Sequence, residues 1–111
     1  MDKLARYRAI VKRILVRYAE QYPSHGQIET APLFDDATDH YMVVDYGWDR
    51  TGRVHAPILH IHLRDGKVWI ELDNTEDGIA KELLDASIPQ QDIVLAFYRP
   101  ERRKLTEFAV A

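Results

Sequence analysis

Three side chains in the middle of the chain have the types and spacing of metal ligands. His60 and His62 are two residues apart in an alternating run, so on a β-strand both would point to the same side. Glu71 lies in the next alternating run and would face them across a hairpin. With Asp73 nearby, such a group could support a small metal-assisted enzyme. A histidine beside an aromatic residue on a sheet is also typical of packing or of an interface, so both interpretations stay open.

Other catalytic chemistry finds little support in the sequence. The chain has no cysteine, which excludes disulfides, thiolate nucleophiles and thiolate metal sites. Its two serines, Ser24 and Ser87, lie in no Gly-x-Ser-x-Gly motif of the hydrolase type. Residues 73–78 begin like a calcium-binding loop, but Lys81 and Leu84 stand where that loop needs oxygen ligands. We therefore expect no catalytic residues and no cofactor.

The N-terminal segment predicts an amphipathic helix. Apolar residues recur at steps of three and four between residues 2 and 22, as on a helix with one buried stripe. The segment 22–26 contains a proline and a glycine, which predicts the end of this helix. One flank of the buried stripe carries Lys3, Arg6, Arg13 and Arg17. This flank is a candidate for phosphate contacts, with a solvated helix face or a protein partner as the alternatives.

Alternating residues predict strands at 40–48, 58–64 and 67–73, a weak strand is expected at 28–35, and 93–98 is expected to form a short, fully buried strand. Pro32 places the strand at 28–35 at a sheet edge or makes it irregular. Asp65 and Gly66 predict a two-residue type I′ turn, because both central residues of that turn need a positive φ. The expected register sets Leu63 opposite Val68, Ile61 opposite Ile70 and Leu59 opposite Leu72 on a core face, with His62 opposite Trp69 and His60 opposite Glu71 on the other face.

The order of elements predicts one α+β domain over residues 1–111. A second helix is expected over residues 74–86, capped by Asn74 or Thr75, and a short helix or turn from Pro100. Strands mostly in one run with helices at the ends favour an antiparallel sheet of four to five strands. We expect the N-terminal and second helices to pack on one face of that sheet.

Apolar and aromatic side chains on the other face predict self-association. His60, His62 and Trp69 would lie there, and the C-terminus, with Phe108 and Val110, is unusually apolar for a tail. The tail either docks on its own domain or enters an oligomer contact. We expect these five residues at an interface and a two-fold homodimer as the most common arrangement.

The net charge of −3 conceals an asymmetry. Residues 1–22 hold six basic and two acidic side chains, giving +4, and residues 23–111 hold nine basic and sixteen acidic ones, giving −7. This balance argues against a uniformly basic nucleic-acid binder, so any DNA contact should be weak, salt-dependent and nearly independent of sequence. No stretch reaches the ~20 apolar residues of a membrane span, and we expect a cytoplasmic protein.

Several segments, in order along the whole chain, resemble one protein family. They are Met1-Asp2-Lys3-Leu4 with Tyr7, Asp39-His40-Tyr41, Val44-Asp45 with Gly47-Trp48-Asp49, His60-Ile61 with Asp65-Gly66-Lys67-Val68-Trp69-Ile70, Thr75-Glu76-Asp77-Gly78-Ile79-Ala80, Asp92-Ile93-Val94-Leu95 and Thr106-Glu107-Phe108-Ala109. The chain is similar to the XisI family, the excision-controlling factors of the fdxN element. It departs from the family pattern at Ser87 and Ala96, where glycine is frequent, and at Tyr98, where histidine is common.

The resemblance implies a role in programmed DNA rearrangement in filamentous cyanobacteria. Such proteins act with a companion, XisH, to control excision by a separate recombinase, and no catalytic residue is assigned to them. Because the companion resembles restriction-type nucleases, the resemblance also allows an inhibitor or assembly module of a nuclease-like partner. The two remaining hypotheses are therefore a non-enzymatic partner-binding factor and a metal-assisted enzyme that uses His60, His62 and Glu71.

Overall fold

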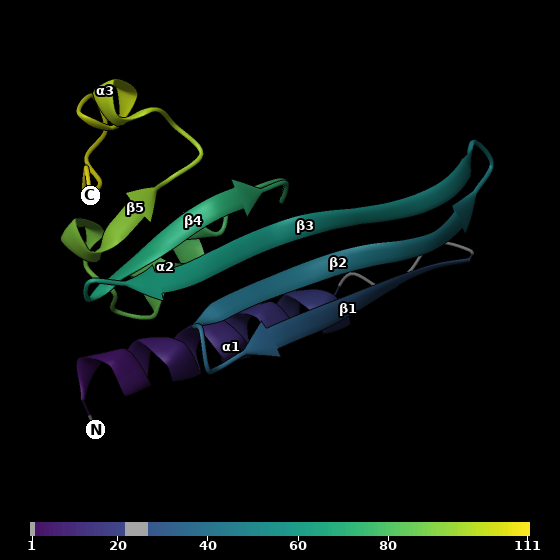
Figure 1. The fold of residues 1–111 in the computed structure, drawn as a ribbon, viewed down its shortest axis with the longest axis horizontal. Helices are drawn as coiled ribbons and strands as arrows, with labels where there is room; N and C mark the ends of the chain where they lie inside the picture. The colour runs from purple at the N-terminus through teal and green to yellow at the C-terminus, as the bar shows by residue number, and fades with distance from the viewer. Residues whose placement is uncertain (1, 22–26) are drawn as a thin grey trace.

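The computed structural model describes residues 2–21 and 27–111, which form three α-helices, one short 3₁₀ helix and one five-stranded sheet (Figure 1). The elements in chain order are α1 (Lys3–Gln21), β1 (Gln27–Asp35), β2 (His40–Asp49), β3 (Gly52–Arg64), β4 (Lys67–Asp73), α2 (Ala80–Asp85), the 3₁₀ turn η1 (Gln90–Asp92), β5 (Ile93–Leu95) and α3 (Pro100–Arg103). The strands lie side by side in sequence order, and β1 to β4 are antiparallel. The predicted α+β fold is confirmed. The connection through α2 returns the chain so that β5 pairs parallel with β4.

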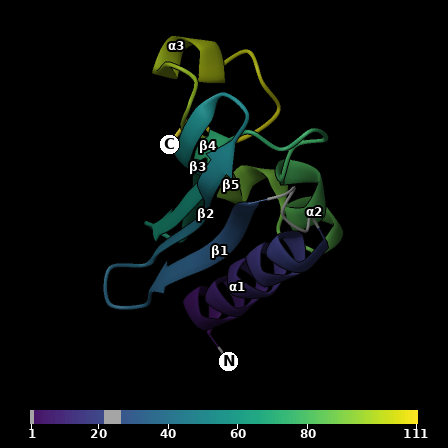
Figure 2. The same cartoon turned by 90° about the vertical axis from the view of Figure 1, so that its right-hand side faces the viewer.

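The helices α1 and α2 lie on the same side of the sheet (Figure 2). The predicted stripe of α1 is confirmed, since Tyr7, Val11 and Leu15 are buried and join Tyr41 and Ile61 of the sheet in one apolar core. We call the helix-covered side of the sheet the core face and the opposite side the outer face. The predicted helix stop at 22–26 lies outside the described residues. No helix in the described part of the chain is long and apolar enough to cross a membrane.

The predicted hairpin between β3 and β4 is confirmed near its turn and wrong farther away. Asp65 and Gly66 have φ values of 54° and 75°, as a type I′ turn requires, and Ile61 lies opposite Ile70. A β-bulge then makes Glu71 an extra residue, so that His60 faces Leu72 and not Glu71. The same bulge sets Leu59 opposite Asp73. Leu72 consequently leaves the core face, where we expected it, and is only partly buried.

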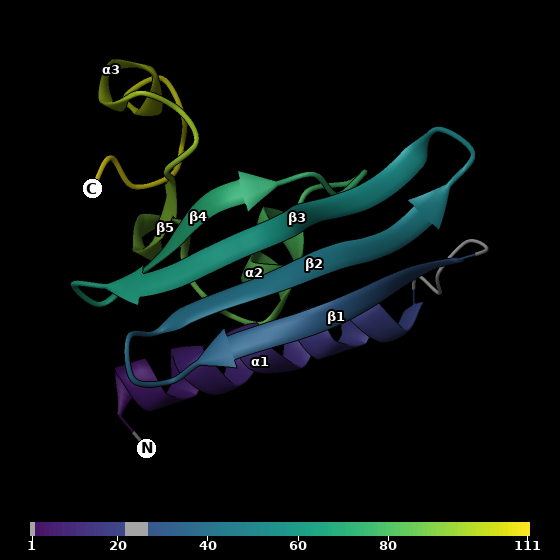
Figure 3. The ribbon, with the colours of Figure 1, turned by 45° about the vertical axis from the view of Figure 1, so that its right-hand side comes forward.

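A second irregularity changes the direction of side chains along β3. Val43 pairs with Leu59 but the next residue, Val44, pairs with Pro57, which makes Ile58 the extra residue. Residues 52–57 of β3 therefore have the opposite parity from residues 59–64. Because β4 pairs only with residues 59–64, the far ends of β2 and β3 extend past it as a long arm (Figure 3).

The second helix is shorter than predicted, because the Asp73 side chain holds the preceding segment as a turn. Its Oδ1 accepts hydrogen bonds from the Thr75 N–H (3.0 Å) and Thr75 hydroxyl (2.5 Å), and its Oδ2 accepts from the Ile79 N–H (2.7 Å). The helix begins at Ala80, so neither Asn74 nor Thr75 is its N-cap. These hydrogen bonds also occupy the Asp73 carboxylate, which stands where the calcium-binding loop has its first ligand.

A residue shortly after α2 has an unfavourable backbone conformation. Ser87 follows the helix with a φ of 74°, in the left-handed region that glycine adopts without a Cβ penalty. We expect Ser87→Gly to raise the free energy of unfolding by about 0.5–1 kcal/mol, because the relieved strain exceeds the added chain entropy. Urea denaturation should show the gain, with Ser87→Ala as the control that keeps the strain. Equal stability of the two variants would contradict this.

Candidate interaction surface and histidine cluster

Three histidines from two strands gather on the outer face with one carboxylate. The β2–β3 register sets His40 directly opposite His62, and the two rings stack with centroids 4.9 Å apart. His40 Nδ1 lies 3.0 Å from His60 Nε2, so one of these nitrogens donates a hydrogen bond to the other. His62 Nε2 lies 2.6 Å from a carboxylate oxygen of Glu71. We call His40, His60, His62 and Glu71 the histidine cluster.

The histidine cluster forms hydrogen bonds among its own members, which suits a structural role better than a catalytic one. His60 Nε2 is directed at His40 and His62 Nε2 at Glu71, so the two expected metal ligands on β3 use different partners. Among the described residues, no group of three or more histidines or carboxylates has the arrangement of a metal site. In residues 2–21 and 27–111, every buried side-chain nitrogen or oxygen has a hydrogen-bond partner. The bulge at Glu71 brings its carboxylate to His62 and away from the position opposite His60.

The sequence reasoning missed His40. Nothing in the sequence fixed the register of its strand against β3. That register depends on the bulge at Ile58, which no residue type there signals. Only the paired strands bring His40 to His60 and His62.

The expected exposure of Trp69 and His62 is wrong. Trp69 is 6% exposed, because the C-terminal segment, residues 96–111, packs against it, and His62 is 9% exposed between the rings of His40 and Trp69. Trp69 stacks on His62 at 5.8 Å and is packed with Val94 and Ala109. Trp69 and His62, which we expected to be exposed, are therefore already packed within one chain.

Arg103 holds the C-terminal segment together, a role that the sequence did not reveal. Its guanidinium donates hydrogen bonds to the carbonyl oxygens of Tyr98 (2.8 Å), Ala96 (3.1 Å) and Val110 (3.3 Å). It also lies over the Trp69 ring, 5.7 Å from the centroid. One cation thus joins three points of this segment to the tryptophan beneath.

Part of the apolar tail docks on its own domain and part of it stays exposed. Phe108 packs on the main core and Ala109 is buried, with its N–H bonded to the Ile93 carbonyl at 2.9 Å. Val110 remains exposed, as do Phe97 and, at 86%, Leu105. The tail docks on its own domain and still presents apolar side chains to solvent.

The rest of the outer face is not covered by a helix. Side chains on one face of β2 alternate with those directed to the core, and cross-strand contacts confirm the assignment: Tyr46 with Glu29, and Trp48 with Arg53. Trp48 and Leu33 are each 54% exposed and Tyr46 is 38% exposed. We call this region the open face, and define it by Leu33, Met42, Val44, Tyr46, Trp48 and Pro57.

The structure separates the four candidate phosphate contacts of α1. Lys3 forms a 3.0 Å ion pair with Asp92, which also accepts a hydrogen bond from the buried Tyr7 hydroxyl. Arg6 lies over the Tyr7 ring at 5.0 Å. Arg13 and Arg17 are exposed and line a shallow hollow together with Glu82 and Asp85 of α2. Two of the four cations are thus engaged within the chain, and the other two lie near carboxylates.

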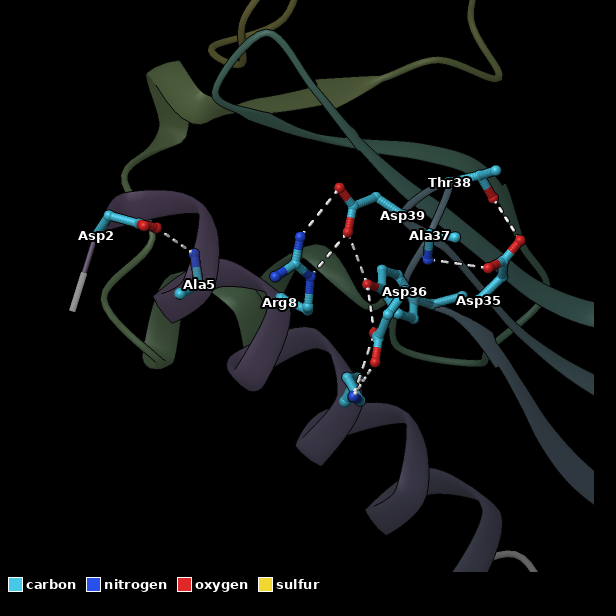
Figure 4. Close-up of polar contacts among 10 residues, drawn as sticks. Asp2, Ala5, Arg8, Asp35, Asp36, Ala37, Thr38 and Asp39 are labelled. Atoms are coloured by element: carbon cyan, nitrogen blue, oxygen red, sulfur yellow. Dashed lines mark hydrogen bonds and ion pairs between the residues drawn. The ribbon is translucent and has the colours of Figure 1, made fainter.

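The other flank of α1 attaches the helix to the turn between β1 and β2 (Figure 4). Arg8 donates to both carboxylate oxygens of Asp39 (2.9 and 3.3 Å), and Lys12 donates to Asp36 (3.0 Å). The buried Tyr41 hydroxyl donates to both aspartates at 2.9 Å. Hydrogen bonds from Arg8 keep the pKa of Asp39 below its usual value, and those from Lys12 do the same for the pKa of Asp36.

The histidine cluster predicts a loss of stability on mild acidification. Burial lowers the pKa of His60 below its ordinary 6.5, and nearby His40 lowers it further, although Glu71 opposes this. The unfolded chain therefore binds a proton more readily, and the free energy of unfolding should fall as the pH drops from 6.5 through the lower pKa. Asp36 and Asp39, whose pKa values are lowered, lose their stabilising contribution only as the pH falls toward and below the ordinary value of 3.8.

We expect His60→Gln to reduce this loss, because glutamine cannot take up the proton. The measurement is the urea midpoint of the variant and of the unsubstituted protein between about pH 7 and pH 5. The same loss in the His60 variant and in the unsubstituted protein would show that another group is responsible.

Comparisons with known proteins cover the whole chain. The model of the XisI protein family matches residues 1–110. A XisI-like protein from Anabaena variabilis ATCC 29413 is 31% identical with a TM-score of 0.91, over 97% of this chain and 99% of that one. The fdxN element excision controlling factor XisI from the same organism is 39% identical with a TM-score of 0.85, over 99% and 100% of the two chains. No curated protein matches significantly. The chain therefore belongs to the XisI family.

Proposed function

We propose that this chain is a non-enzymatic controlling factor for excision of a DNA element of the fdxN type, and that it acts through a XisH-like protein partner. Support comes from the match to the XisI family over residues 1–110 and from the similar structure of a protein named as such a factor. A factor that controls a recombinase needs surfaces for other proteins and no reaction centre of its own. The side chains of this protein fit that requirement.

The observation that carries the non-enzymatic role is the internal bonding of the histidine cluster. His62 is almost fully buried, and its Nε2 is engaged by Glu71 at 2.6 Å. A metal-assisted enzyme would need His60, His62 and Glu71 directed at one point with an open position for water. In this structure they are instead directed at two different partners, and the aromatic ring of Trp69 covers one side of His62.

The C-terminal segment offers the companion a surface. Leu105 is the most exposed large apolar residue in the described chain, and Phe97 and Val110 are also exposed. Arg103 fixes the backbone on both sides of this patch through the carbonyls of Ala96, Tyr98 and Val110. Exposed apolar side chains on a segment that hydrogen bonds hold in place favour a protein contact.

We expect co-expressed XisH-like companion to purify with the tagged chain, and Leu105→Glu to reduce the amount recovered at least about tenfold. Leu4→Glu, a similar change on α1, is the matched control for solubility and charge. Glu71→Gln should leave excision in a complemented strain unchanged within about threefold, whereas loss of an enzymatic base costs about 100-fold or more.

Two results would contradict the proposal. The first is a companion that never purifies with the chain under any of these conditions. The second is excision that disappears in a folded Glu71→Gln variant, which would restore the metal-assisted alternative. If the companion is bound and its nuclease activity falls while excision is unaffected, the chain is an inhibitor or assembly module of that nuclease-like partner.

Direct DNA binding should be weak. Only Arg13 and Arg17 of the four candidates are free to reach phosphates, and carboxylates of α2 lie close to them. We expect a slope of about −2 for log affinity against log salt, because about two counterions are released, and little discrimination between duplexes. Titration of labelled duplex at two salt concentrations measures both, with Arg13→Ala and Arg17→Ala as the test of location. Tight, sequence-specific binding at physiological salt would make this domain a DNA reader.

A further inference from the structure

We propose that the open face binds a second copy of this chain, in a two-fold symmetric dimer whose axis runs along β2 between the two stacked sheets. This inference concerns the chain alone and goes beyond its proposed work with a companion. It also moves the predicted homodimer contact away from Trp69 and His62, which are buried within one chain.

The open face has the composition of the centre of an interface. Trp48 and Tyr46 are its exposed aromatic residues, and Leu33, Met42 and Val44 continue the apolar surface toward the histidine cluster. Both helices of the core lie on the opposite side of the sheet (Figure 2). Contiguous aromatic and aliphatic side chains of this kind on a strand surface usually mark a contact with another molecule.

Charge on the open face is arranged so that the face complements itself. Glu29 of β1 lies opposite Tyr46 in the strand register, and its nearby carboxylate raises the pKa of the Tyr46 hydroxyl. Arg53 of β3 lies over the Trp48 ring at 5.5 Å, on the other side of β2. The face therefore has an acidic β1 side, an apolar centre on β2 and a basic β3 side.

A two-fold axis parallel to β2 exchanges the β1 and β3 sides. Glu29 of each copy then faces Arg53 and His55 of the other copy, while the β2 residues of both copies meet at the centre. Long side chains can bridge stacked sheets, which pack about 10 Å apart. An in-plane axis perpendicular to β2 would instead place the acidic side of one copy over the acidic side of the other. Charge complementarity thus selects one of the two arrangements.

Pairing through the edges of the sheet is disfavoured, which leaves the open face as the contact. Pro32 lies in the edge strand β1, and Pro57 lies in the part of β3 that β4 does not pair. A proline at an edge removes a donor that an added strand would use. A second copy would therefore stack on the sheet and not extend it.

Sedimentation of the purified full chain tests the dimer. We expect a mass near twice the 12.9 kDa of one chain at micromolar concentrations. Trp48→Arg should weaken association at least about 30-fold, as expected for an aromatic residue at the centre of an interface. Its thermal unfolding should remain cooperative, because the side chain lies largely in solvent within one chain. Leu105→Glu should leave the dimer unchanged.

A charge exchange tests the orientation. Glu29→Arg alone and Arg53→Glu alone should each weaken association, since each creates two like-charged contacts. Mixing the two single variants should restore it as a heterodimer, because both contacts then pair arginine with glutamate. The double variant in one chain should also dimerise. These variants lie on exposed positions and test the proposal even if Trp48→Arg does not fold.

Two outcomes would overturn the proposal: a monomer at every concentration, or a dimer that is unaffected by Trp48→Arg and by both single charge changes. Single variants that dissociate but are not restored by mixing would overturn the stated axis. Because no companion is present in these experiments, their failure would leave the proposed partner contact at Leu105 to its own test.

Discussion

The apolar stripe of α1 packs on only one face of a five-stranded sheet. Tyr7, Val11 and Leu15 are buried there against strand residues, and α2 adds Leu83 to the same layer. Most of the apolar surface that this small domain buries is in that layer. Residues 2–21 and 27–111 contain no second long helix for the outer face. Each feature of the outer face, from the C-terminal segment to the open face, follows from this one-sided arrangement.

The outer face is divided into a closed part and an open part. Residues 96–111 close the part beside β4, where Arg103 and Trp69 hold them, and the histidine cluster lies next to Trp69. No described element covers the part formed by β1 and the far ends of β2 and β3 in this way. Buried polar groups in the closed part satisfy one another, as a structural network should. The open part has exposed aromatic residues and complementary charges, which suit binding.

Local patterns in the sequence predicted the elements well, because each pattern reports a short-range preference. The stripe of α1, the type I′ turn at Asp65 and Gly66, and the edge position of β1 with Pro32 all follow from one segment at a time. The two bulges do not. Ile58 and Glu71 have no residue type that marks a bulge, and each bulge changes the parity of every side chain beyond it. Leu72 was misplaced for this reason.

The candidate site was predicted in part. His60, His62 and Trp69 do share the outer face, but the cover over Trp69 depends on long-range contacts from Arg103 and Ala109 that the sequence cannot reveal. His40 joins the cluster only through the register between β2 and β3. The alternating pattern correctly predicts that Trp48 lies in a strand. Its exposure depends on which elements pack on that strand, and no described helix packs on Trp48.

We propose that the open face binds a second copy of the chain, whereas Trp69 and the histidine cluster have a structural role. The chain contains two tryptophans, one in each part, which makes fluorine NMR of 5-fluorotryptophan-labelled protein the most direct measurement. Trp48 is 54% exposed and Trp69 6% exposed, so each signal reports on its own surface. Between the unsubstituted dimer and the dissociated Glu29→Arg variant, only the Trp48 signal should move. Movement of the Trp69 signal alone, or of neither signal, would contradict the claim.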